Sequence, residues 1–264
     1  MISLFRKIRQ KLLSQNRVTR YLVYAIGEII LVVIGILIAL QVNNWNEYRK
    51  DRIEEQELLI QLESEFQSNL EQLDEKIDVR NHLIQSSMKL LELIDSKNPV
   101  LPDTIIYYTS KTMIAPTFDP ITNDLISAGK LQLLTNKRLK NLLSLWTSEV
   151  LQVTEDELSW RSVMNNQYFP FLIEKSSLRN LISGYWSTNQ INSILLDKQK
   201  QVRFSILTNQ ELEKLPELLK EDDFGDYLAD CATWNTIINS QSETLRERIV
   251  EILTLIQEDL KSSK

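Results

Sequence analysis

The chain has 264 residues, 43% of them apolar and 25% charged, a composition that is ordinary for a globular protein able to bury a sizeable core. Residues 1–21 carry six of the 30 basic residues and no acidic one, so the 24 basic residues that remain face 36 acidic ones, a net charge of −12. Such an acidic main domain repels phosphate, which argues against nucleic acid as its partner.

Residues 1–20 are predicted to form a basic segment at a membrane surface. In residues 2–17 the apolar side chains recur near one helical face and the cations lie on the other, which is typical of a helix resting on anionic lipid. The alternative is a loose basic tail that only sets membrane topology. The cations assigned to the lipid surface are Arg6, Lys7, Arg9, Lys11, Arg17 and Arg20.

Residues 21–43 are predicted to form a transmembrane helix. From residue 22 to residue 42 the only charge is Glu28, and this length spans about 31 Å as a helix. A cleaved signal peptide has a shorter apolar region and ends in a small-x-small site, whereas Leu37 stands two residues before Ala39. The basic residues before the span place the N-terminus in the cytoplasm. Aromatic side chains expected at the two interfaces are Tyr21, Tyr24, Trp45 and Tyr48.

Glu28 is the unusual residue of this span, because an ionised carboxylate facing lipid is costly. It has three interpretations. Its side chain snorkels towards the cytoplasmic headgroups, or it contacts a partner helix together with Gly35 and Ala39, which lie on nearly the same helical face and form a small-xxx-small step. The third interpretation is proton transfer, by analogy of layout with the smaller subunit of proton-driven stator complexes.

The rest of the chain is predicted to be all-α, because glycine and proline cluster in two places and leave long helix-forming stretches between them. The expected helices are residues 44–97, which continue the span without a break, then 130–169 and 223–261. In the first and last, apolar residues recur at intervals of three and four. The predicted core positions of the first helix are Leu59, Leu62, Phe66, Leu70, Leu73, Ile77, Ile84, Met88 and Leu91. Those of the last are Tyr227, Cys231, Trp234, Ile238, Gln241, Leu245, Ile249, Ile252 and Ile256.

Helix ends are also predicted from capping chemistry. Asp119 is expected to cap a helix that begins at Pro120 and stops at Gly129, and Thr208 with Glu211 forms a capping box. Further cap candidates are Asp103, Thr135 and Asp222.

Catalytic signatures are not found in the sequence. It has no HExxH, no phosphate-binding glycine loop, no CxxC and no GxSxG, and its single histidine, His82, has no partner for a metal. We therefore expect a non-enzymatic protein without cofactor or metal, with Cys231 as a small core residue. A corner within residues 118–143 is either a ligand pocket or the packed link between two helices; its polar residues are Asp119, Asn123, Asp124 and Lys130.

The N-terminal pattern FRKIRQKLL, followed by YLVYAIGEIILVVIGILIALQVNNWNEYRK, resembles the opening of an uncharacterised family of bacterial single-span membrane proteins. The signature is YAIGEIxLVVIGILIALQxNNWNE. A second segment, DLISAGKLQLLTNKRLKNLLSLW, resembles the family's later block, L-x-S-x-G-x-L-x-L-I. The resemblance implies a bacterial inner-membrane anchor with residues 44–264 in the periplasm, and it implies no activity.

The expected function is that of an envelope scaffold or interaction module, bound to membrane lipid and to a protein partner or a second copy through the transmembrane helix. One alternative is a periplasmic sensor or ligand-binding domain, with residues 118–186 as its site, that acts through a partner. The other is an accessory subunit of a proton-driven membrane complex that uses Glu28.

Overall fold

The computed structural model describes residues 7, 18–121, 130–188, 204, 206, 212 and 214–262. Every regular element among these residues is a helix, which confirms the predicted all-α class. The chain divides into two compact units, Met1–Leu58 and Leu59–Lys264, and each is described by itself.

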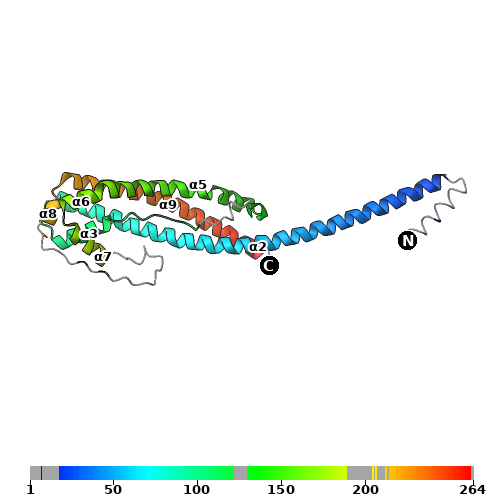
Figure 1. Cartoon of the computed structure of the whole chain (residues 1–264), viewed down its shortest axis with the longest axis horizontal. Helices are drawn as coiled ribbons and strands as arrows, with labels where there is room; N and C mark the ends of the chain where they lie inside the picture. The colour runs from blue at the N-terminus through cyan, green and yellow to red at the C-terminus, as the bar shows by residue number, and fades with distance from the viewer. Residues whose placement is uncertain are drawn as a thin grey trace. The chain divides into compact units, whose positions relative to one another are not determined.

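Helix α2 (Val18–Ser96) begins in the N-terminal unit and continues into the second unit as one element, as predicted (Figure 1). No proline or glycine interrupts it between Gly35 and its end, so each turn keeps its backbone hydrogen bonds. Its side chains from residue 29 to residue 45 are all exposed. This stretch is long and apolar enough to cross a membrane, and its exposure distinguishes it from the buried core helix of a soluble domain.

The C-terminal end of α2 leads into a short helix, α3 (Pro102–Thr112). Lys97 adopts a left-handed backbone conformation, with φ of 53°, as often occurs just past a helix end. The prediction that Asp103 caps α3 is wrong. The capping position is Leu101, which makes no side-chain cap bond, and Pro102 opens the helix, where no backbone N–H is needed. Asp103 lies in the first turn, near the positive end of the helix dipole.

A non-helical return segment, residues 114–121, runs back along the bundle. The Asn69 side chain accepts a hydrogen bond from Ile121 N–H at 2.7 Å and donates one to its carbonyl at 3.1 Å. Gln72 binds the N–H and the carbonyl of Asp119 in the same way, at 2.8 and 3.0 Å. The predicted helix start at Pro120 is therefore wrong, because α2 side chains hold this backbone outside a helix. Gly129 and the capping box of Thr208 and Glu211 lie outside the described residues.

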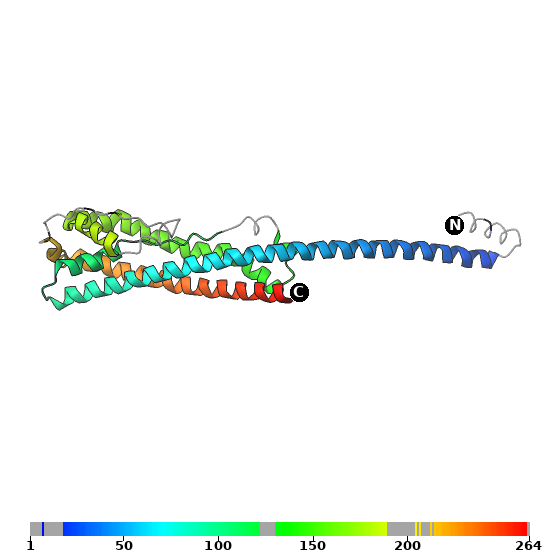
Figure 2. The ribbon, with the colours of Figure 1, turned by 90° about the horizontal axis from the view of Figure 1, so that it is seen from below.

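Helices α2, α5 (Lys137–Val163) and α9 (Asp222–Ser262) lie side by side in the second unit (Figures 1 and 2). Helix α9 is antiparallel to α2, as the pairs Asp74–Arg246 and Glu63–Gln257 demonstrate. Helix α5 is parallel to α2, since Phe66 packs against Trp146 and Arg80 bonds Glu157. Two neighbouring parallel helices require a long connection, which the return segment provides.

Helix α5 starts at Lys137 rather than at residue 130. The Asn136 side chain accepts hydrogen bonds from the N–H groups of Arg138 and Leu139, so Asn136 is the cap and not Thr135. The preceding residues form a 3-10 turn, η1 (Lys130–Leu133). Helix α9 starts at Asp222, so this predicted cap residue lies inside the helix.

Helix α5 ends where a π-helical turn, η2 (Met164–Tyr168), leads into α6 (Phe169–Lys175). Pro170 opens α6 and has no N–H to donate, and the Phe169 N–H reaches back to the Met164 carbonyl. The predicted helix to residue 169 is thus interrupted after Val163. The π-turn places Tyr168 in the core, where its hydroxyl hydrogen-bonds Thr112 at 2.8 Å.

Two further helices, α7 (Leu178–Thr188) and α8 (Lys214–Leu218), complete the end of the unit at which α2 ends. Gly184 lets α7 approach α3 closely, because a Cβ at this position would overlap Ile106 Cγ2. Without that close approach the two short helices could not pack directly.

The core lies between α2, α5 and α9. Leu59, Leu62, Phe66 and Leu73 are buried as predicted, and Cys231 is fully buried. Leu70, Ile77, Ile84 and Leu91 are partly buried, and of the predicted α2 positions only Met88 is wrong. Met88 is 55% exposed, whereas the buried positions along this part of α2 are Arg80, Leu83, Ser86, Ser87 and Leu90.

Candidate functional site

The predicted contact face of the span lies on the exposed part of α2. Gly35 and Ala39 are exposed, and a Cβ added at Gly35 would meet no atom within 4 Å. Glu28 is partly buried. No packing against the described residues therefore requires glycine at position 35, and among these residues the surface around it is open to lipid or to another helix.

Trp45 and Tyr48, the predicted aromatic anchors after the span, are 66% and 59% exposed. The Arg52 guanidinium lies 5.2 Å from the centre of the Tyr48 ring, close enough for a cation–π contact. Both side chains of the aromatic pair are thus free of the core, as a headgroup-level position requires. The side chains of Tyr21 and Tyr24 lie outside the described residues.

The basic segment and the predicted ligand corner are described only in part. Lys7 is exposed. Asp119 and Lys130 are also exposed, and Asp119 is held through its backbone by Gln72. The predicted residues that lie outside the described residues, as whole residues or as side chains, are Arg6, Arg9, Lys11, Arg17, Arg20, Asn123 and Asp124.

A buried polar network joins the three long helices at the centre of the bundle. The Arg80 guanidinium is fully buried and donates to Glu157 Oε1 at 2.6 Å, Asn239 Oδ1 at 2.7 Å and Ser242 Oγ at 2.8 Å. The second oxygen of Glu157 accepts the backbone N–H of Phe118 at 2.7 Å. The network therefore ties α2, α5, α9 and the return segment to one another.

Burial is the main influence on the protonation of this pair. It lowers the pKa of Arg80, and the Glu157 carboxylate beside it acts in the opposite direction. Burial likewise raises the pKa of Glu157, while Arg80 and the Phe118 N–H act against that rise. Each carboxylate oxygen of Glu157 thus accepts a hydrogen bond, so the pair can hold its opposite charges inside the core.

Sequence periodicity does not reveal this network, because the pattern that predicts core positions consists of apolar residues only. Arg80 follows Leu73 by seven residues and precedes Leu83 by three, so it stands on the apolar face of α2. On α9, Asn239 and Ser242 lie in the same way between Ile238 and Leu245. A polar residue at a core interval was the available signal.

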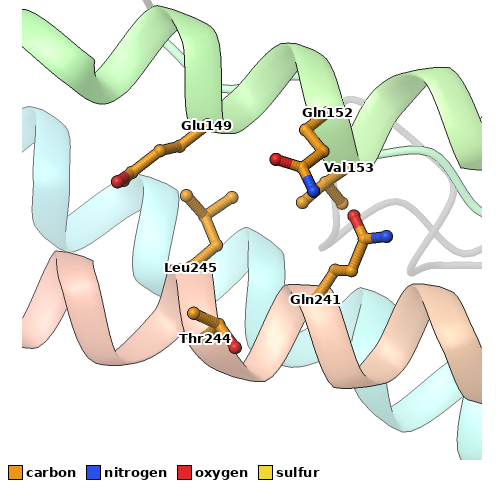
Figure 3. A pocket seen from close by; sticks show the side chains of 6 residues that line it. All are labelled: Glu149, Gln152, Val153, Gln241, Thr244 and Leu245. Atoms are coloured by element: carbon orange, nitrogen blue, oxygen red, sulfur yellow. The ribbon is translucent and has the colours of Figure 1, made fainter.

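A small hollow opens between α5 and α9, with a volume of about 220 Å³. Its apolar floor is formed by the buried Val153 and Leu245. Figure 3 shows Gln152 and Gln241 reaching towards each other from the two helices, and the remaining lining residues are Glu149 and Thr244.

Two cross-links between the helices stand at the ends of this hollow. Arg248 Nε donates to Glu149 Oε2 at 3.2 Å, and Gln241 Nε2 donates to Asp156 Oδ2 at 2.7 Å. Gln241 Oε1 is buried and accepts no hydrogen bond from the described residues. The hollow therefore places one unsatisfied buried acceptor, Gln241 Oε1, above an apolar floor, with the polar side chains of Glu149, Gln152 and Thr244 around it.

The comparisons with known proteins give one match. Residues 28–101 match a family of unknown function, DUF6090. The match begins at Glu28, follows α2 to its end and includes Arg80. It supports the predicted likeness to an uncharacterised family. No curated protein and no solved structure matches the chain.

Proposed function

We propose that this protein is a non-enzymatic scaffold or interaction module of the bacterial cell envelope, anchored in the inner membrane by α2 with its helical domain in the periplasm. The observation that carries the proposal is that one unbroken helix contains both the exposed apolar stretch and a face of the domain core. The basic residues before the span support this orientation, and the exposed Trp45 and Tyr48 after it support a membrane interface at that level.

The absence of enzymatic activity is part of the proposal. The buried acid and base of the domain, Glu157 and Arg80, bond each other, and Cys231 is buried in the core, where its pKa is raised to about 12. A thiol with such a pKa is a poor nucleophile at neutral pH. These features favour a structural role for the groups that could otherwise carry chemistry.

Cysteine accessibility tests the orientation. In a Cys231→Ala background, Lys7→Cys and Glu71→Cys each place one thiol on an exposed side chain, one in each unit. With a membrane-impermeant maleimide and a permeabilised outer membrane, Glu71→Cys reacts in whole cells and Lys7→Cys reacts only after lysis. The reverse pattern would place the domain in the cytoplasm and end the periplasmic proposal.

Proximity labelling tests the interaction role. A labelling enzyme fused to the C-terminus of the full chain is compared with the same enzyme fused to residues 1–58. The full chain is expected to label a reproducible set of envelope proteins that the anchor alone does not label. If the two sets coincide and the purified full chain runs as a monomer, the scaffold role is wrong.

Two alternatives have a specific observation in their favour. The hollow between α5 and α9 has room for only a very small ligand, and if the domain binds one, that ligand would raise the thermal midpoint of the full chain. Glu28 inside the span favours an accessory subunit that carries protons. Loss of function in both Glu28→Gln and Glu28→Leu would support proton transfer, and loss only in Glu28→Leu would support a hydrogen-bonded helix contact.

A further inference from the structure

We propose that the groove between α5 and α9 binds one amphipathic helix of a partner protein, and that this helix inserts a hydrogen-bond donor, the side chain of Lys, Asn or Gln, into the hollow. The inference rests on the proposed interaction role and specifies which face of the domain carries it. At about 220 Å³ the hollow is smaller than the usual site for a small molecule, and it suits a single inserted side chain.

The regular pairing of the two helices orders the side chains of the groove before any partner binds. The cross-link positions are seven residues apart on both helices, Glu149 and Asp156 on α5 and Gln241 and Arg248 on α9. The hollow is thus flanked by two fixed pairs about 10 Å apart by helical rise. Since both pairs hold their side chains in place, a partner does not need to order them on binding.

The chemistry of the hollow selects a donor. Gln241 Oε1 is a buried acceptor that no described residue satisfies, and in Figure 3 it lies on the side of its amide that faces α5. The Glu149 carboxylate at the other end is already paired with Arg248, so the choice of a donor depends on Gln241 Oε1. A buried polar atom of this kind gains a hydrogen bond from an incoming N–H, whereas an incoming carboxylate oxygen is itself an acceptor and would leave Gln241 Oε1 unsatisfied.

Exposed apolar side chains extend the groove at both ends. Leu145 stands one turn before Glu149 and is 52% exposed, and Ile237 stands one turn before Gln241 and is 45% exposed. Because the helices are antiparallel, these residues lie beyond opposite ends of the hollow, about 22 Å apart by helical rise. A partner helix of four turns covers that length, with apolar residues near its ends and the donor at its middle.

A partner with a central Lys also matches the charge of the domain, since residues 22–264 carry a net charge of −12.

The experiment uses a displayed library of 17-residue alanine-based helical peptides, randomised at positions 2, 9 and 16 and selected against the full chain in nanodiscs. Apolar residues are expected at positions 2 and 16, with Lys, Asn or Gln at position 9. Selected peptides should lose at least tenfold in affinity for Thr244→Trp, which fills the hollow.

The matched control is Glu243→Trp, a substitution at an exposed α9 position that does not line the hollow, and it should leave the affinity unchanged. Gln241→Leu removes the acceptor and should abolish the preference at position 9 while the apolar positions stay selected. No enrichment, or enrichment that survives Thr244→Trp, overturns the proposal. If this happens while proximity labelling still finds partners, only the groove is wrong and the interaction role stands.

Discussion

Arg80 and Glu157 are two opposite charges without contact with water, and the balance between burial and pairing decides what each contributes. Removing one partner leaves the other charge buried, which typically costs about 3–5 kcal/mol. We therefore expect Arg80→Met to lower the free energy of unfolding by that amount. Urea unfolding of the full chain in detergent, followed by the fluorescence of the buried Trp146 and Trp160, measures it.

The control for Arg80→Met is the same substitution at Arg246, whose ion pair with Asp74 also joins α9 to α2 but is exposed at the surface. Arg246→Met should cost less than about 1 kcal/mol. The double variant Arg80→Met with Glu157→Gln should be more stable than Arg80→Met alone, because no charge then stays buried. Equal losses for Arg80→Met and Arg246→Met would mean that burial does not govern the pair.

Cys231 makes the free energy of unfolding depend on pH, and the burial of its thiol determines the sign of this dependence. Desolvation raises the pKa of this thiol from 9.0 to about 12, so the folded state holds the proton more firmly than the unfolded state. Its contribution to stability is fully present below pH 9 and is lost as the pH rises through about 12. The stability of the wild type relative to Cys231→Ala should fall between these values, with a slope of up to about 1.4 kcal/mol per pH unit.

The test of this dependence is to measure the free energy of unfolding of both proteins at several alkaline pH values. Tyr168 is also buried, and burial raises its pKa in both proteins, so only the smaller part of that rise that Cys231 causes stays in the difference. A constant difference from pH 8 to pH 11 would contradict the burial of the thiol. Below pH 8 the two curves should run parallel.

At the scale of elements, the contact between α3 and α7 depends on Gly184. A methyl group there would overlap Ile106 Cγ2, and overpacking of this kind typically costs about 1–3 kcal/mol. Gly184→Ala should therefore destabilise the domain in the same urea experiment. Gly225→Ala in α9, where an added Cβ meets no atom, should instead gain about 0.5–1 kcal/mol from helix propensity. Two changes of the same sign would contradict this packing.

The same elements indicate how much could be predicted from the sequence. The all-α class and the single long α2 follow from the distribution of glycine and proline, because these residues act locally. The start of α5 depends on whether Thr135 or Asn136 takes the capping position, and neighbouring residues of similar chemistry do not separate these possibilities. The conformation at Asp119 depends on Gln72, which is 47 residues away, so no local pattern contains it.

Of the candidate site residues, some could be predicted from the sequence and others could not. Cys231 in the core was predictable, because an apolar stripe surrounds it. For Arg80 the sequence signals only its place on the apolar face of α2. Its partners Glu157, Asn239 and Ser242 come from two other helices, and their alignment is a property of the folded bundle. The groove between α5 and α9 was hidden for the same reason.

At the scale of the whole molecule, association through the span is the testable feature. In a Cys231→Ala background, Gly35→Cys and Val33→Cys place thiols on opposite sides of α2. Positions 33 and 35 are separated by two residues, which corresponds to a rotation of about 200° around the helix axis. If copies associate through the face of Glu28, Gly35 and Ala39, oxidative cross-linking in membranes should be several times stronger at position 35. Equal yields at the two positions would exclude that face.

The separation of α2 and α9 along the chain has a consequence for how the protein is made. Arg80 finds Asn239 and Ser242 about 160 residues later in the chain. At synthesis rates of about 5–20 residues per second, α9 is synthesised roughly 10–30 seconds after the part of α2 that it packs against. During that interval the leucines on this part of α2 have no α9 to cover them. Premature termination before Asp222 would therefore leave a product without a closed core, and such a product is expected to aggregate.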